Sequence, residues 1–423
     1  MLLLLVIIYL AFISLGLPDA ILGSAWPIMS KNLNASLEFA GAVSLVISLG
    51  TVISSLMTAK LINQFGIGKV VAFSVLLTAS ALLGFSMANF ALALMLLAIP
   101  LGIGAGAVDA ALNNYVAQNY ESKHMNYLHS FWGVGATAGP LIMANYLMLN
   151  EGWRQGYMAI TLIQFALVII LFASLPLWKK AITAKQEETD SDSYISSKAS
   201  NSITNNTSNR KAFGILGVKI QLVMFFCYCA LEAGTGLWAA SYLSIEKGLS
   251  PEDAAFWTAV FYLGITCGRF LCGFVSGKVA EKVAATGSEK SAHKLNEEGL
   301  IRLGVITIIL GVLVLISPLP SALSPLGLML IGLGCAPIYP NTIHLTPKRF
   351  SASASQAVIG LSMACAYIGT TLVPPFIGAL VSYLSFALYP ALLLILALGL
   401  LVTTERLRGF SPEKKHNGVL GEA

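Results

Sequence analysis

Long apolar segments follow one another along almost the whole chain, and they constrain its fold more than any other feature. A helix of about 20 apolar residues crosses a bilayer core of about 30 Å, and charged or turn residues divide this sequence into twelve such segments. They cover residues 2–29, 38–60, 68–88, 91–118, 126–149, 154–178, 214–243, 254–277, 300–317, 323–346, 355–383 and 385–403. Only 11% of the residues are charged, against about 25% in soluble proteins. The sequence therefore predicts an all-α membrane protein with twelve transmembrane helices.

Between the sixth and seventh segments, residues 179–213 break this pattern. The stretch consists mainly of charged and small polar residues, a composition that cannot bury a core and is typical of disordered linkers. It separates an N-terminal six-helix half, residues 1–178, from a C-terminal six-helix half, residues 214–405. A tail at residues 406–423 follows the second half.

The two halves repeat the spacing of some glycine and proline residues. Gly135 precedes Pro140 by five residues, and Gly369 precedes Pro374 by five. Such internal symmetry is expected of a transporter whose two repeats rock about a central site, although rows of glycine also serve close helix packing. We therefore expect two pseudo-symmetric halves that work by alternating access.

Basic residues lie almost entirely in the loops of one side. Of the 25 lysines and arginines, Lys31, Arg154 and Lys247 lie in loops on the other side and Arg269 lies inside a segment. The positive-inside rule then places both termini and the linker in the cytoplasm. We expect a multi-pass protein of the plasma membrane, of bacterial origin.

Several classes of protein are excluded by what the segments contain. The basic residues do not gather on one face with aromatic residues, as nucleic-acid binding would require. The cysteines lie inside apolar segments without metal-ligand spacing, and no nucleotide loop or Ser–His dyad indicates an enzyme. We expect no metal or cofactor, and a chain that functions as a monomer with lipid, protons and a small-molecule substrate as its partners. The six cysteines are Cys227, Cys229, Cys267, Cys272, Cys335 and Cys365.

Four ionisable side chains lie well inside apolar segments: Asp19, Asp109, Glu232 and Arg269. Each costs about 2.5–3.5 kcal/mol at the centre of a membrane helix. Such residues face a water-filled cavity or one another, so the three acids are candidates for proton coupling and Arg269 for their charge partner, with Glu232 as the expected counter-ion. A purely structural ion pair is the alternative interpretation.

Two of these acids have suggestive neighbours. Asp19 follows Pro18, which withholds a backbone donor and interrupts a helix. Asp109 and Asn113 are four residues apart and share one helix face. A carboxylate beside an amide binds hydroxyl groups well, because both accept hydrogen bonds and the amide also donates. We therefore predict that Asn113 contributes to substrate binding.

Aromatic residues and a histidine complete the candidate site. His129 opens the fifth segment and is a candidate for substrate binding or proton relay. Trp132 and Trp238 are candidates for stacking on a substrate, for example a sugar. The alternative is that the histidine packs between helices and that the tryptophans belong to the interfacial belt of membrane proteins.

Three stretches resemble the fucose–galactose–glucose:proton symporters of the major facilitator superfamily. Residues 18–22 are similar to the Asn-Asp-Ile-Leu stretch of that family's fucose permease, and residues 104–116 to its Gly-x-Gly-x-x-Glu-x-Ala-x-Asn motif. Residues 126–131 are similar to its fifth-helix start. The resemblance implies a major facilitator fold, sugar symport, and roles in proton coupling and sugar recognition for Asp19 and Asp109.

The chain also departs from that family. His129 occupies the position of a sugar-holding glutamine, and residues 59–66 lack the acid and arginine of the superfamily's loop motif. Residues 135–140 are similar to the Gly-Pro signature of antiporters. Two functions therefore stay open: proton-coupled import of a sugar or similar polar solute, and proton-driven export of a metabolite or drug.

Overall fold

The computed structural model describes residues 2–120, 122–149, 152–178, 213–286, 297–320, 323–350 and 352–408, and in these ranges all regular secondary structure is helical. Most of the predicted linker and of the predicted tail lies outside the described residues. The N-terminal half contains α1 (Leu2–Asp19), α2 (Ile21–Asn32), α3 (Phe39–Phe65), α4 (Ile67–Met87), α5 (Ala91–Asn119), α6 (Ser122–Met148) and α7 (Trp153–Ala173). The C-terminal half contains α10 (Leu216–Ile245), α11 (Pro251–Thr286), α13 (Glu297–Ile316), α14 (Leu326–Cys335), α15 (Ile338–Phe350), α16 (Ala352–Tyr383), the 3-10 turn η2 (Phe386–Leu388) and α17 (Tyr389–Leu407).

Eleven of the predicted spans recur among the described residues as helices long and apolar enough to cross a membrane. The remaining prediction, 126–149, falls within α6, which has 27 residues and packs against α1 and α11. Its hydropathy is diluted by glycines that the packing needs. A Cβ on Gly135 would meet the backbone of Ile13 and Leu17 in α1, so α1 and α6 approach closely only because this position lacks a side chain.

Two spans are each divided into two helices. The first is interrupted at Ala20, between α1 and α2, and the tenth at Ala336 and Pro337, between α14 and α15. A proline lies at or just before each interruption, where it withholds the backbone donor that a continuous helix requires. The predicted span at 323–346 is confirmed, as Leu326–Phe350, but the sequence analysis did not predict the interruption within it. A further difference is that α11 continues to Thr286, beyond the predicted end at residue 277.

The second half of α1 is tied to α7 by the buried side-chain amide of Gln164. Because Pro18 has no N–H, the carbonyl of Ser14 loses its helical partner. Gln164 of α7 donates from Nε2 to that carbonyl at 2.6 Å, and the Ser14 hydroxyl donates to Oε1 of Gln164 at 2.5 Å. The carbonyl released by the proline is thus satisfied inside the bundle, and the end of α1 is held in place beside α6.

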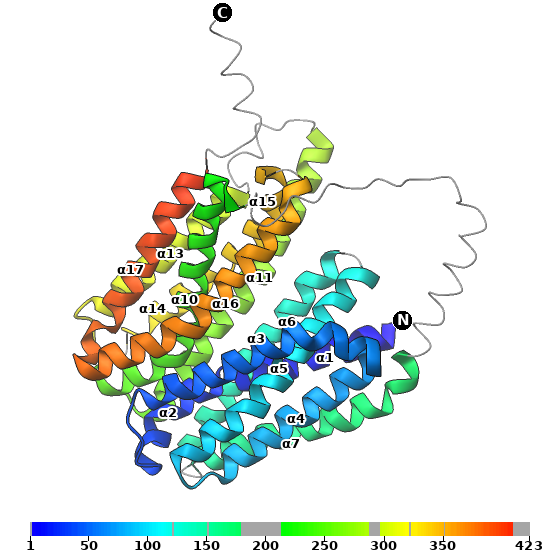
Figure 1. The fold of residues 1–423 in the computed structure, drawn as a ribbon. Helices are drawn as coiled ribbons and strands as arrows, with labels where there is room; N and C mark the ends of the chain where they lie inside the picture. The colour runs from blue at the N-terminus through cyan, green and yellow to red at the C-terminus, as the bar shows by residue number, and fades with distance from the viewer. Residues whose placement is uncertain are drawn as a thin grey trace, which may run out of the picture.

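The two halves form two helix bundles (Figure 1). They meet mainly along α2 with α10, α3 with α16 and α6 with α11, and α2 also contacts α11. Figure 1 shows that the bundles diverge toward the ends that carry the N and C termini. The fold thus places a contact zone between the halves, lined by the helices that carry the predicted site residues.

Glycines let the halves touch backbone to backbone at the other end. A Cβ on Gly23 of α2 would lie 2.7 Å from the carbonyl oxygen and 2.8 Å from the Cα of Leu237 in α10. A Cβ on Gly41 of α3 would lie 2.8 Å from the Cα of Pro375 in α16. Both distances are shorter than real Cβ contacts, so this end of the interface closes only without side chains at these positions.

Candidate functional site

Asp19 is the last residue of α1, directly before the interruption of the first span. Its side chain is exposed although both of its chain neighbours, Pro18 and Ala20, are buried. Its Oδ2 accepts a hydrogen bond from Nε1 of Trp132 in α6 at 2.7 Å. A carboxylate that is accessible in the middle of an apolar span requires a polar, hydrated surrounding, which is the setting expected of a site that exchanges protons.

Trp132 joins the two halves. While its indole N–H bonds to Asp19, its ring faces α11 of the other half, with the Arg269 guanidinium carbon 5.4 Å from the ring centroid. Tyr262 of α11 meets the same indole edge-on, with ring centroids 6.2 Å apart. A cation at this distance over an indole is attracted by the negative face of the ring. One side chain thus contacts a carboxylate of one half and a guanidinium of the other.

Arg269 lies close to its predicted partner on α10. Its Nη2 is 3.9 Å from Oε1 of Glu232, and the two side chains are 14% and 17% exposed. This separation is at the upper limit of an ion pair, so the pair is loose in this conformation. The guanidinium is shared between Glu232 and the ring of Trp132.

Asp109 and Asn113 form the expected pair on α5. Nδ2 of Asn113 donates to Oδ1 of Asp109 at 2.8 Å, and both side chains are half-buried. Asp109 is close enough to interact electrostatically with Asp19 and with the hydroxyls of Tyr339 and Tyr367. Since both tyrosines belong to the other half, this carboxylate also faces the contact zone.

His129 lies one turn before Trp132 on α6 and belongs to the same cluster. Its ring meets Phe12 edge-on at 5.9 Å and lies 6.4 Å from the ring of Tyr339 in α15. It is also within electrostatic reach of Arg269. The structure therefore brings together seven of the eight predicted site residues: Asp19, Asp109, Asn113, His129, Trp132, Glu232 and Arg269.

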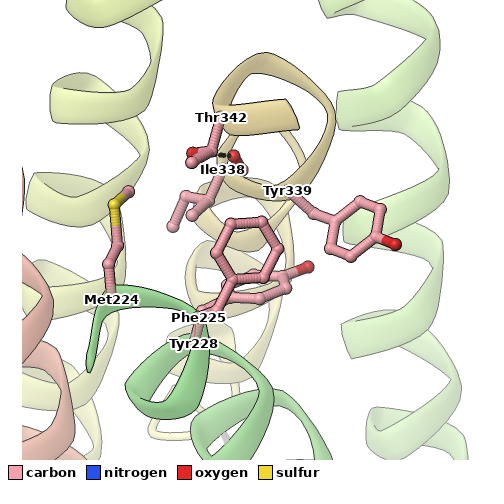
Figure 2. A pocket seen from close by; sticks show the side chains of 6 residues that line it. All are labelled: Met224, Phe225, Tyr228, Ile338, Tyr339 and Thr342. Carbon is pink, nitrogen blue, oxygen red and sulfur yellow. Dashed lines mark hydrogen bonds between the residues drawn. The ribbon is translucent and has the colours of Figure 1, made fainter. Parts of the chain in front are cut away.

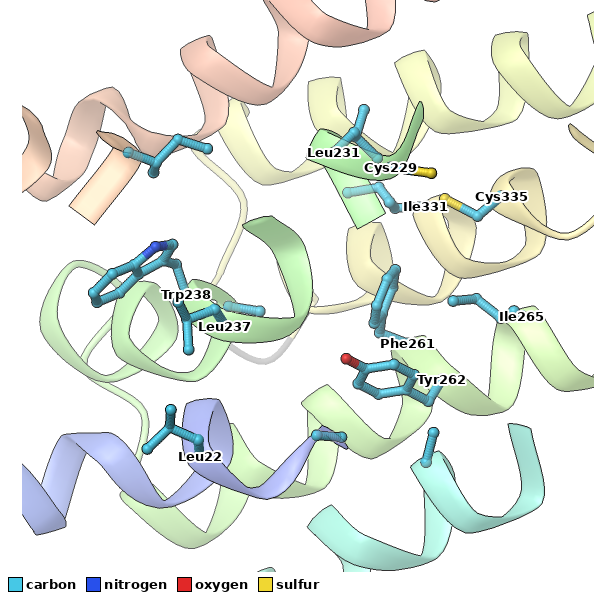
Figure 3. Close-up of a cluster of buried hydrophobic side chains, with 14 of the residues drawn as sticks. Leu22, Cys229, Leu231, Leu237, Trp238, Phe261, Tyr262, Ile265, Ile331 and Cys335 are labelled. Carbon is cyan, nitrogen blue, oxygen red and sulfur yellow. The ribbon is translucent and has the colours of Figure 1, made fainter. Parts of the chain in front are cut away.

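Trp238 is the residue that the structure does not bring to this cluster. It is fully buried, and its Nε1 donates to the carbonyl of Pro374 at 2.7 Å. Figure 3 shows its ring well apart from Tyr262 and Cys335. In this conformation the indole packs between α10 and α16 and presents no free face to a substrate.

Sequence reasoning missed the tyrosines of the C-terminal half. Tyr339 of α15 and Tyr262 of α11 reach His129 and Trp132 across the interface. Tyr339 also borders a narrow apolar recess between α10 and α15 (Figure 2). Tyrosine is common in apolar segments, so the sequence holds no signal that separates these from packing residues. The recess is lined by Met224, Phe225, Tyr228, Ile338, Tyr339 and Thr342.

The cluster combines charged, polar and aromatic side chains. It offers carboxylates, an amide, a guanidinium and several aromatic rings, groups that can form hydrogen bonds and stacking contacts. Within the residues that the structure describes, no group of three or more His, Cys, Asp and Glu side chains is placed to hold a metal ion.

Comparison with known proteins agrees with this architecture. The model of the Major Facilitator Superfamily matches residues 8–324, well over half of the chain. The chain belongs to the major facilitator superfamily. This major facilitator protein is accordingly a membrane transporter and not an enzyme.

Relatives of this major facilitator protein are distant. It is 22% identical to Bypass of stop codon protein 6 of Saccharomyces cerevisiae, over 90% of this chain and 77% of that protein. It is 23% identical to the glucose/mannose transporter GlcP of Bacillus subtilis, over 64% of this chain and 65% of that protein. Among solved structures, a D-xylose-proton symporter aligns with a TM-score of 0.69 at 14% identity, covering 97% of this chain and 98% of that one. At such identity the structural likeness shows the fold alone.

We expect Glu232 and Arg269 to stabilise the protein as a coupled pair. Glu232→Gln or Arg269→Gln alone leaves one buried charge without its partner, whereas the double variant removes both. The loss in unfolding free energy of the double variant should therefore fall short of the sum of the single losses by about 1 kcal/mol. Thermal unfolding of the four purified proteins in detergent measures this difference.

The exposed pair of Glu405 and Arg408, 3.1 Å apart, is the matched control. Exposed pairs contribute little, so the corresponding cycle should be additive to within about 0.5 kcal/mol. Additive losses at Glu232 and Arg269 as well would show that the two charges do not act together.

Proposed function

We propose that this transporter imports a sugar or a similar small polar solute together with protons, by alternating access. The observation that carries the proposal is the accessible carboxylate of Asp19, hydrogen-bonded to Trp132 at the interface of the two halves. A carboxylate in this place gains and loses a proton as the halves expose it to one side or the other. Asp109 is the second proton-coupling acid, and Glu232 the third candidate.

The neighbouring side chains support a sugar as the substrate class. Asn113 beside Asp109 presents a donor and acceptors for hydroxyl groups, and Trp132 and His129 supply ring faces. The similarity to a glucose/mannose transporter points to the same class. The resemblance to the fucose–galactose–glucose:proton symporters, with histidine at position 129 in place of glutamine, belongs to this proposal. We assign Trp238 a supporting role behind the site.

The proposal also includes the orientation of the protein in the membrane and the units that move. The basic residues favour cytoplasmic termini and a cytoplasmic linker at 179–213 in a plasma-membrane protein. The bundles diverge toward the terminal ends, so the conformation would then face the cytoplasm. We propose that the halves 1–178 and 214–405 are the moving units and that one chain suffices for transport.

Transport in proteoliposomes tests this function. Vesicles with an acidic outside should accumulate a radiolabelled hexose or pentose above its equilibrium concentration, and a protonophore should abolish the accumulation. Vesicles with a sodium gradient alone serve as the control and should reach equilibrium only.

The opposite result would support the runner-up function. Accumulation driven only by an acidic inside, with the solute moving against the protons, would identify an antiporter and overturn symport. The Gly-Pro stretch at 135–140 is the sequence feature that keeps this alternative open, although in the structure Gly135 serves the close approach of α6 to α1.

A further inference from the structure

Trp132 makes two contacts with charged side chains, one with a carboxylate and one with a guanidinium. Its indole N–H donates to the carboxylate of Asp19 at 2.7 Å, within the N-terminal half. Its ring face lies 5.4 Å from the guanidinium carbon of Arg269, in the C-terminal half. The N–H lies in the ring plane, so the bond to Asp19 fixes the plane and thereby the direction in which the ring face points.

Arg269 has an alternative partner within its own half. Glu232 lies 3.9 Å away, farther than the about 2.7–2.9 Å of a charge-assisted hydrogen bond. The guanidinium can therefore close on Glu232 if the ring of Trp132 no longer holds it. Two arrangements of Arg269 are thus available, one that crosses the interface and one that does not.

We propose that Trp132 is a positioning residue that converts the protonation of Asp19 into release of the contact between α6 and α11. With Asp19 ionised, the indole is held by a hydrogen bond to a charge, and its face retains Arg269 across the interface. With Asp19 protonated, the acceptor is neutral and the bond weaker. The ring is then free to turn, and Arg269 moves to Glu232.

The other charged and titratable groups around Asp19 fit this scheme. Asp109 of α5 interacts electrostatically with Asp19. His129, one turn before Trp132 on α6, lies within electrostatic reach of Arg269. Tyr262 of α11 contacts Trp132 and interacts electrostatically with Asp19. Low pH therefore loosens the α6–α11 contact and high pH maintains it.

The packing at this point allows such release. Gly133, next to Trp132, lies so close to Thr266 of α11 that a Cβ there would overlap the Thr266 hydroxyl. The interface around Trp132 includes Gly133 against Thr266, the edge-on contact of Trp132 with Tyr262 and the contact of Trp132 with Arg269. Loss of the Trp132–Arg269 contact removes a charge-dependent attraction between these two helices.

The inference deepens the proposed function, because it explains how a coupled proton moves the halves, but its test needs no transport. Spin labels at Phe65, the last residue of α3, and at Phe213, three residues before the start of α10, report the distance between the halves in a background without native cysteines. Both positions are exposed. In substrate-free protein the distance distribution should change between pH 8 and pH 5. Trp132→Phe, which keeps a ring but lacks the N–H, should show the low-pH distribution at both pH values.

Two further variants make the result specific. Asp19→Asn is neutral at every pH and should also show the low-pH distribution throughout, which tests the scheme even if Trp132→Phe does not fold. Trp257→Phe, on α11 and edge-on to Phe256, should keep the pH-dependent change of the parent protein.

Two kinds of result would overturn the role of Trp132. A pH-independent distribution in the parent protein, or an unchanged pH response in Trp132→Phe or Asp19→Asn, would show that Trp132 does not transmit the charge of Asp19. A pH response without concentrative uptake of any solute would instead contradict the proposed symport and leave the role of Trp132 intact.

Discussion

Asp109→Asn should abolish accumulation of substrate against a gradient and leave exchange of substrate across the membrane intact. Asparagine keeps the size of aspartate and its hydrogen bond with Asn113, but it cannot gain or lose a proton. A gradient of one pH unit provides about 1.4 kcal/mol per proton, or a tenfold concentration ratio for one coupled proton. With Asp109→Asn, the substrate concentrations on the two sides of the membrane should become equal. Uptake and counterflow at several pH values measure both properties.

Asn113→Ala is the matched control, one helical turn away on the same face of α5. It removes a binding amide and no titratable group, so it should weaken substrate binding while residual transport stays proton-coupled. If Asp109→Asn still concentrates substrate with unchanged pH dependence, Asp109 has a structural role. Asp19 or Glu232 would then become the leading coupling residue.

Gly23→Leu should stop transport without unfolding the protein. The backbone of α10 lies within 2.8 Å of a Cβ at this position, so a leucine side chain prevents α2 and α10 from meeting at the closed end of the interface. Each half keeps its own core, because the obstruction lies between the halves. Initial uptake rates should fall to background, while thermal unfolding in detergent reports an intact fold.

Gly360→Leu is the comparison for this prediction. Gly360 is also a helical glycine, but a Cβ there meets nothing within 4 Å. Its replacement should leave uptake close to that of the parent protein. Normal transport by Gly23→Leu would mean that this end of the interface need not close as tightly as the structure shows.

The spans were predictable because hydropathy alone determines them. Runs of apolar residues between charges located eleven spans directly, and α6 was located although Gly135, Gly139 and polar residues dilute its hydropathy. The interruption at Pro337 was not predicted, since several other spans contain a proline inside a continuous helix, for example Pro100 in α5 and Pro140 in α6. Whether a proline divides a span depends on which neighbours satisfy the released carbonyl.

The site was predictable where its geometry is local. Asp109 and Asn113 are paired by helix periodicity alone. The bond between Asp19 and Trp132 joins residues 113 positions apart, and its existence depends on how α1 lies against α6. Trp238 has the same residue type, yet it packs against Pro374, because its environment is set by α16 and not by its own helix.

The closed end of the interface and the candidate site are built from different residues, although α10 contributes to both. Gly23 and Gly41 close the interface through backbone contact, whereas the polar side chains of the site come from α1, α5, α6, α11 and an earlier turn of α10. Backbone contacts at these glycines do not take part in recognising the transported solute. Evolution can therefore exchange the residues that recognise a solute, one helix face at a time, while the machinery that keeps the membrane tight is inherited unchanged.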